Sequence, residues 1–130
     1  MRERLLLQFF VAVGGLIPVA AGTAGIFLGP EFFGATIGTA VDSHFRYLSG
    51  LLLGLGLGFW STIPRIEANG TRFQLLTFLV FVGGLARLFS LIVIGIPPVG
   101  MLDALAMELG VTPLLCWWQW RLSRKLRSKI

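Results

Sequence analysis

The sequence predicts an all-α fold: a four-transmembrane-helix bundle with the N-terminus and C-terminus on the cytoplasmic side. The chain of 130 residues is 55% hydrophobic and only 13% charged, whereas about a quarter of the residues of a soluble domain are charged. Four apolar stretches follow one another, and most basic residues lie on one predicted side of them. Because the length suits one domain, we expect residues 1–130 to form a single transmembrane domain.

Each apolar stretch is close to the length that a membrane-spanning helix needs. About 20 residues in a helix cross about 30 Å of hydrocarbon, and a helix satisfies its own backbone polar groups. A soluble bundle would need a polar stripe along every helix, and these stretches have almost none. The predicted helices are residues 5–28, 44–62, 73–95 and 101–120, followed by a basic interfacial tail at 121–130.

The distribution of basic residues predicts the orientation. Nine of the eleven Lys and Arg residues lie at the N-terminus, between the second and third stretches, or in the tail; residues 29–43 and 96–100 contain none. With an even number of spans these three regions share one side, which the positive-inside rule assigns to the cytoplasm. The net charge of +5 therefore indicates binding of the tail to anionic lipid headgroups rather than to nucleic acid.

Three charged residues lie inside the apolar stretches: Arg46, Arg87 and Glu108. A charge at the bilayer centre costs about 2.5–3.5 kcal/mol on insertion scales, so such residues normally face the bundle interior and have a partner. The helical rise places Arg87 and Glu108 at one level, roughly 10 Å below the outer edge. We expect a polar cluster there in which Glu108 pairs with Arg87, Arg46 or both, and Ser90 shares the helix face of Arg87.

Small residues share faces with these charges. Gly50, Gly54 and Gly58 follow Arg46 at intervals of four, and Gly83 precedes Arg87 by four. Small residues at this spacing let membrane helices approach closely, so these four glycines are the predicted helix-packing positions. Pro113 lacks a backbone N–H and is expected to kink the last helix, freeing the Leu109 carbonyl.

Two interpretations of the cluster remain open, with a proton relay as a third. The ion pair fixes only helix register, or its spare arginine donors bind an anionic or carbonyl-bearing ligand such as a quinone headgroup or a lipid. Other chemistry finds little support in the sequence. Cys116 is the only cysteine and His44 the only histidine, so we assign no metal, no catalytic residue and no cofactor other than such a bound quinone or lipid.

Two runs of the sequence match a known pattern. They are HFRYLSG at residues 44–50 and GGLARLFS at 83–90, followed by Gly95, Pro97 and Glu108. Together they resemble the bacterial membrane family called domain of unknown function 4345, which is similar in layout to four-helix DoxX-like proteins. The resemblance implies a multi-pass protein of the cell inner membrane and covers nearly the whole chain. The link of DoxX-like proteins to quinone-coupled oxidoreductases favours the quinone interpretation, although the cysteines or haem ligands of an electron carrier are missing here.

These observations favour a non-enzymatic accessory or scaffold subunit of a membrane complex, packed against another membrane protein or a second copy of itself. The alternative is a binding protein or enzyme for a quinone-like or lipid-like hydrophobic ligand, which would use Arg46, Arg87 and Glu108.

Overall fold

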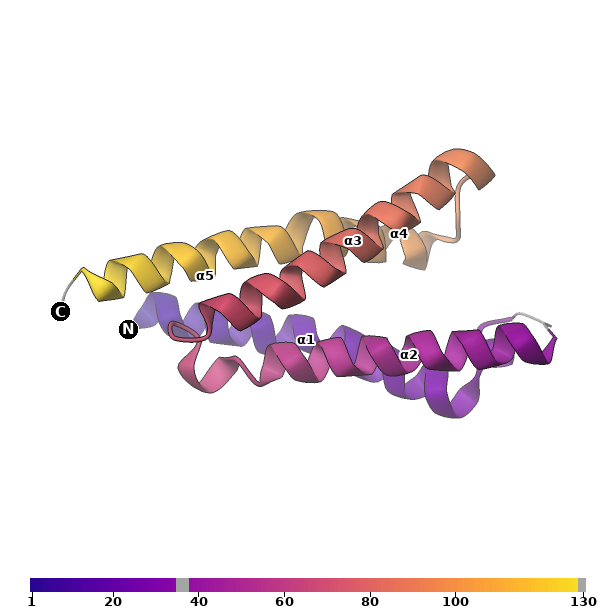
Figure 1. Ribbon diagram of the computed structural model, residues 1–130, viewed down its shortest axis with the longest axis horizontal. Helices are drawn as coiled ribbons and strands as arrows, with labels where there is room; N and C mark the ends of the chain where they lie inside the picture. The colour runs from indigo at the N-terminus through magenta and orange to yellow at the C-terminus, as the bar shows by residue number, and fades with distance from the viewer. Residues whose placement is uncertain (35–37, 129–130) are drawn as a thin grey trace. The chain divides into compact units, whose positions relative to one another are not determined.

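The computed structural model describes residues 1–34 and 38–128, and helices are the only regular secondary structure in these ranges. Four helical segments are long and apolar enough to cross a membrane, as predicted (Figure 1). The first three spans contain α1 (Arg2–Leu28), α2 (Thr39–Trp60) and α3 (Gly70–Ile94). The fourth, Val99–Arg127, combines α4 (Val99–Ala106), the π-helical turn η3 (Met107–Val111) and α5 (Thr112–Arg127). Two short 3-10 turns are η1 (Pro30–Phe33) and η2 (Ile63–Arg65).

The helices extend beyond the predicted apolar stretches. Helix α2 begins at Thr39 rather than at residue 44, and α5 continues to Arg127, so the described part of the basic tail is mostly helical. Hydropathy marks where a chain enters hydrocarbon, and a helix can continue past that point into the interface. The added turns suit the helix dipole, because Asp42 lies in the first turn of α2 and three basic residues lie in the last turn of α5.

The chain divides into two compact units. The hairpin unit is Phe9–Ile63 and contains most of α1 together with α2. The terminal unit is Met1–Gln8 with Pro64–Ile130 and contains the start of α1, α3 and the fourth span. The prediction of one transmembrane domain concerns both units together and stays a prediction.

Glycines bring α1 and α2 together in the hairpin unit. A Cβ atom on Gly22 would lie 2.6 Å from the backbone nitrogen of Leu53, and one on Gly56 would lie 2.7 Å from a Val19 methyl group. The Trp60 indole N–H donates to the Ala12 carbonyl across the same pair at 3.0 Å. The two helices therefore pack through small residues and a hydrogen bond, as membrane helices commonly do.

These close contacts lie at other glycines than the sequence predicted. A Cβ atom on Gly50, Gly54 or Gly83 would meet no described heavy atom within 4 Å, whereas one on Gly84 would meet the fourth span. Neighbouring positions on a helix point about 100° apart because there are 3.6 residues per turn. A glycine-rich run therefore does not by itself say which of its glycines faces a neighbour. Gly58 is half-buried, and its predicted packing role stays a prediction.

A small core holds the terminal unit together where the start of α1 approaches α5. Leu7, Ile66, Phe73 and Leu122 are buried there. Gln119 is fully buried among them, and its Nε2 donates to the Ile66 carbonyl at 2.8 Å and to Ser123 Oγ at 3.0 Å. We call these six residues the terminal junction.

Polar contacts from both chain ends surround the terminal junction. Arg4 donates to the Pro64 carbonyl at 3.0 Å and pairs with Glu67 at 3.1 Å. Lys125 pairs with Glu3 at 2.8 Å, and Ser123 Oγ donates to the Glu67 carbonyl at 2.8 Å. The N-terminal turn, the connection before α3 and the end of α5 are therefore tied to one another.

The glycine contacts lead to a first prediction. Gly22→Ala should lower the free energy of unfolding by roughly 1–3 kcal/mol, because the new methyl group forces α1 away from the α2 backbone. Gly54→Ala, the matched control, should leave stability unchanged or raise it by up to about 1 kcal/mol through helix propensity. Reversible unfolding in mixed micelles measures both values, and equal losses in the two variants would contradict the packing described.

Candidate functional site

Arg87 on α3 and Glu108 in η3 form a bidentate ion pair between two candidate spans. Arg87 Nε donates to Glu108 Oε2 at 3.0 Å, and Nη2 donates to Oε1 at 3.2 Å. The planar guanidinium matches the carboxylate, so both hydrogen bonds form at once. The Arg87 side chain is 35% exposed and that of Glu108 is 19% exposed. The pair is therefore partly shielded and remains accessible from the arginine side.

Gly84 allows the two helices to approach closely enough for this pair. It is buried and lies one turn before Arg87 on α3. A Cβ atom there would lie 3.0 Å from Glu108 Cβ and 2.7 Å from Leu109 Cδ2. Any larger residue would push the fourth span away from α3 and lengthen the distance that the two charged side chains must bridge.

The fourth span accommodates Pro113 with a π-helical turn. The Thr112 backbone N–H donates to the Met107 carbonyl, five residues earlier, and Thr112 Oγ1 donates to the same carbonyl at 2.9 Å. A proline in a regular α-helix clashes with the carbonyl four residues before it, which is that of Leu109. The structure thus has a wider turn where the sequence predicted a kink.

The π-turn leaves the main-chain carbonyl of Glu108 without a helical donor. The donors available to the Glu108 carbonyl are the N–H groups four and five residues later. Thr112 has given its N–H to Met107, and Pro113 has none. No side chain among residues 1–34 and 38–128 donates to this carbonyl. The position of Pro113 in the sequence predicts a freed carbonyl at Leu109 and gives no indication of the one at Glu108.

Arg46 has two partners within the hairpin unit. Its Nε donates to Asp42 Oδ2 at 2.9 Å, one turn earlier on α2, and its Nη1 donates to the Ile26 carbonyl. Ile26 lies in the last turn of α1, where carbonyls have no helical donor. Arg46 therefore caps α1 within the hairpin unit. The i, i+4 spacing of Asp42 and Arg46 was visible in the sequence and favours this pairing.

Ser90 also differs from the expectation. It is exposed, and its side chain forms no hydrogen bond with any residue that the structure describes. A spacing of three residues puts Ser90 near Arg87 on the helix surface, but a serine side chain is short and does not reach the carboxylate of Glu108. Of the four predicted residues, the structure brings together Arg87 and Glu108.

The polar part of the terminal junction was not predicted from the sequence. Gln119 is fully buried, and its Oε1 has no hydrogen-bond partner among the described residues. Gly70 leaves room for it, since a Cβ atom there would lie 3.4 Å from Gln119 Nε2. The available indication was the pair of polar residues Gln119 and Ser123, four residues apart beside apolar Leu122.

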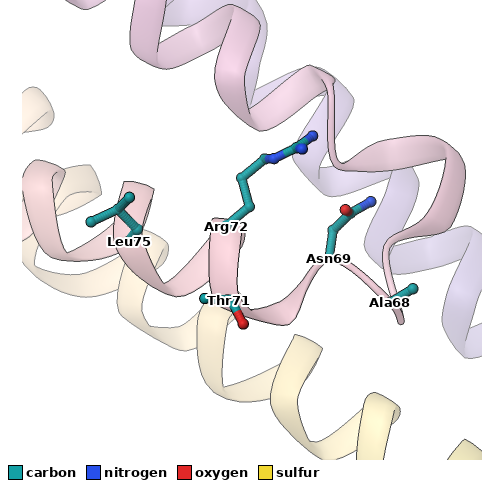
Figure 2. Close-up of a pocket in the computed structure, with 5 residues that line it drawn as sticks. All are labelled: Ala68, Asn69, Thr71, Arg72 and Leu75. Carbon is teal, nitrogen blue, oxygen red and sulfur yellow. The ribbon is translucent and has the colours of Figure 1, made fainter.

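A shallow hollow of about 410 Å³ lies at the start of α3 (Figure 2). Arg72 and Leu75 line it on the helix, and Asn69 lies at the turn before it. Arg72 precedes Arg87 by fifteen residues on the same helix, about 22 Å along its axis, so the hollow is separate from the ion pair. No group of three His, Cys, Asp or Glu side chains within the described ranges is placed to hold a metal ion.

Comparison with known families identifies the chain at the family level. The sequence model of the family described as domain of unknown function 4345 (DUF4345) matches residues 6–119. The chain belongs to this family. The DUF4345 region contains Arg46, Arg87, Glu108 and Pro113, and it ends at Gln119 before the basic turns of α5. No curated protein and no solved structure matches the chain.

A double-mutant cycle tests the ion pair. Arg87→Gln and Glu108→Gln should each lower the free energy of unfolding, because each leaves one charge in the span without its partner. The double variant should be less destabilised than the sum of the two, with a coupling energy of roughly 0.5–3 kcal/mol. Reversible unfolding in mixed micelles measures the cycle. Strict additivity would show that the two side chains do not interact in the membrane.

Proposed function

We propose that this DUF4345 protein is an integral protein of a bacterial inner membrane, with four spans and both termini in the cytoplasm. The burial of the candidate spans supports this. Of the 18 most apolar consecutive residues in each span, 22%, 17%, 11% and 0% are buried, in chain order. Contiguous apolar surface of this extent is rare on soluble monomers and suits contact with lipid.

The terminal junction supports the proposed orientation. It joins the regions that carry most of the basic residues, and the Lys125–Glu3 pair connects the two ends of the chain. Arg121 lies 5.6 Å from the Trp117 ring centre and Arg124 lies 4.8 Å from that of Trp120. Tryptophan is typical of the headgroup level on either side of a membrane, and arginine favours the cytoplasmic side, where basic side chains bind anionic lipids.

Within the membrane, we propose a non-enzymatic role as an accessory or scaffold subunit. The observation that carries this proposal is the exposure of the fourth span. None of its 18 most apolar consecutive residues is buried. A helix that buries so little against its own chain has faces available for a second membrane protein or another copy. The Arg87–Glu108 pair fixes the register of α3 and the fourth span, so these faces are held in place for a partner.

A second candidate function is binding of a hydrophobic ligand that has a polar head, such as a quinone or a lipid. The Arg87 side chain favours it, since it is 35% exposed and its pair with Glu108 uses Nε and Nη2 only. The Nη1 group of Arg87 has no partner among the described residues, and a guanidinium holds its N–H donors in a fixed planar fork. A ligand with an acceptor atom would satisfy this group.

Cysteine labelling tests the orientation. In a Cys116→Ser background, Ser128→Cys should react with a membrane-impermeant maleimide only in inside-out vesicles, and Ser43→Cys only in right-side-out vesicles. Both serines are exposed and lie on opposite predicted sides of the membrane. The proposed arrangement has three spans between residues 43 and 128, so the two cysteines must face opposite sides. Labelling of both variants from the same side would overturn it.

Native mass spectrometry after mild extraction tests the accessory role. We expect a complex with a second membrane protein or another copy, and Leu114→Trp should weaken it. Leu114 is 66% exposed on the fourth span, and a bulkier side chain there disturbs a packed interface. The matched control Leu16→Trp, at a position 54% exposed on α1, should leave the complex intact. A species that is monomeric in every preparation would count against the proposal.

A further inference from the structure

We propose that the π-turn of the fourth span binds a hydroxyl group carried on an apolar tail, such as a phenol-type or glycerol-type head. Arg87 would donate to the hydroxyl oxygen, and the Glu108 main-chain carbonyl would accept the hydroxyl hydrogen. This inference rests on the second candidate function and names the class of ligand that the site would take.

The acceptor is the Glu108 carbonyl, which lacks both helical donors because of Thr112 and Pro113. A backbone carbonyl without a donor is costly in hydrocarbon. Freed carbonyls in membrane helices are often satisfied by a nearby Ser or Thr side chain. The nearest one here, Thr112, has already donated its hydroxyl to Met107 at 2.9 Å. A donor from outside the described chain is therefore needed.

The donor is the part of Arg87 that Glu108 leaves unused. A guanidinium has five N–H groups, and the carboxylate accepts from Nε and Nη2. Both N–H groups of Nη1 remain without a described partner, and the side chain is more than a third exposed. Inside a span these groups also require a partner.

The combination of a donor and an acceptor selects the chemistry of the ligand. A ketone, an ester or a phosphate could accept from Arg87 and would leave the Glu108 carbonyl unsatisfied. An ammonium group could donate to the carbonyl but would face the positive charge of Arg87. A hydroxyl group does both, because it has one O–H donor and two lone pairs.

The depth of the turn requires an apolar tail on the ligand. Met107–Val111 follows Val99, where the fourth span begins, by eight to twelve residues, or about 12–18 Å along the helix. That lies near the centre of a hydrocarbon core about 30 Å thick. A hydroxyl compound reaches this depth readily only if the rest of the molecule partitions into lipid.

One carbonyl signal can report the interaction directly. Glu108–Leu109 is the only Glu–Leu dipeptide in the sequence. Labelling with carbonyl-¹³C glutamate and ¹⁵N leucine therefore gives a single carbonyl–nitrogen correlation, that of Glu108, in nanodisc NMR spectra. The probes are 4-octylphenol, 1-lauroylglycerol and 4-octylanisole, the methyl ether of the first probe, which has lost only its hydroxyl donor.

We expect at least one hydroxyl probe to move the Glu108 carbonyl resonance downfield, and the ether to leave it in place. The hydroxyl probe with the lower Kd identifies the source of the head, a phenolic ring or a glycerolipid. If the ether binds as tightly as the phenol and moves the signal equally, the inference fails while the ligand-binding function stands. If none of the three probes binds, both fail, which would leave the turn to water or to packing alone.

Variants separate the carbonyl from the arginine. Pro113→Ala supplies an N–H to the turn, so the Glu108 signal should move downfield without ligand and the affinity for the phenol should fall about tenfold. Pro18→Ala, the matched control inside α1, should change neither. Arg87→Gln should weaken binding of the phenol and of lauroylglycerol alike. If the folded Pro113→Ala protein binds both hydroxyl probes with full affinity, the inference is overturned. If that variant does not fold, the comparison of the phenol with its ether in the unaltered protein decides.

Discussion

Polar groups inside apolar helices must find partners within the protein or in a bound molecule, and this constraint organises the structure. Hydroxyl side chains in the helices turn back to carbonyls one turn earlier, as in Thr23 to Val19 at 2.7 Å and Thr77 to Phe73 at 2.8 Å. Arg46 caps the end of α1. Buried Gln119 donates to the connection before α3. The Arg87–Glu108 pair is the strongest case, because neither charge is stable in hydrocarbon without the other.

The same constraint explains why the terminal unit keeps its shape with few buried residues. Hydrophobic burial does little to join helices that are already surrounded by lipid, so close packing and hydrogen bonds take over. Gly84 provides the close packing of α3 with the fourth span, and the ion pair beside it sets their register. At the other end of α3, Gln119 and Ser123 hold the connection through main-chain carbonyls. Two polar attachment points, one on α3 and one in the connection before it, hold α3 against the fourth span.

The sequence was sufficient for the properties that depend on composition and local spacing. Hydropathy predicted the four spans and the helical class, and the levels of Arg87 and Glu108 followed from helical rise alone. The identity of the packing glycines could not be predicted, since Gly83 and Gly84 differ only in the direction in which they point. The i, i+4 spacing of Asp42 and Arg46 indicates their pairing within the hairpin unit, and a place for Arg46 in the polar cluster stays a prediction. The π-turn could not be predicted, because a proline indicates that the helix must change and does not say whether it kinks or widens.

Register fixing and ligand binding need not be alternatives at this site. A carboxylate accepts a fork of two N–H groups from a guanidinium, which has five, so the Arg87–Glu108 pair can be neutral in charge and still unsaturated in hydrogen bonds. Glu108 makes the presence of Arg87 in a span tolerable, and the π-turn that contains Glu108 also leaves its carbonyl without a helical donor. A donor and an acceptor thus remain after the helices have been joined. The geometry that sets the register of the two helices is therefore also the geometry that would recognise a small polar head.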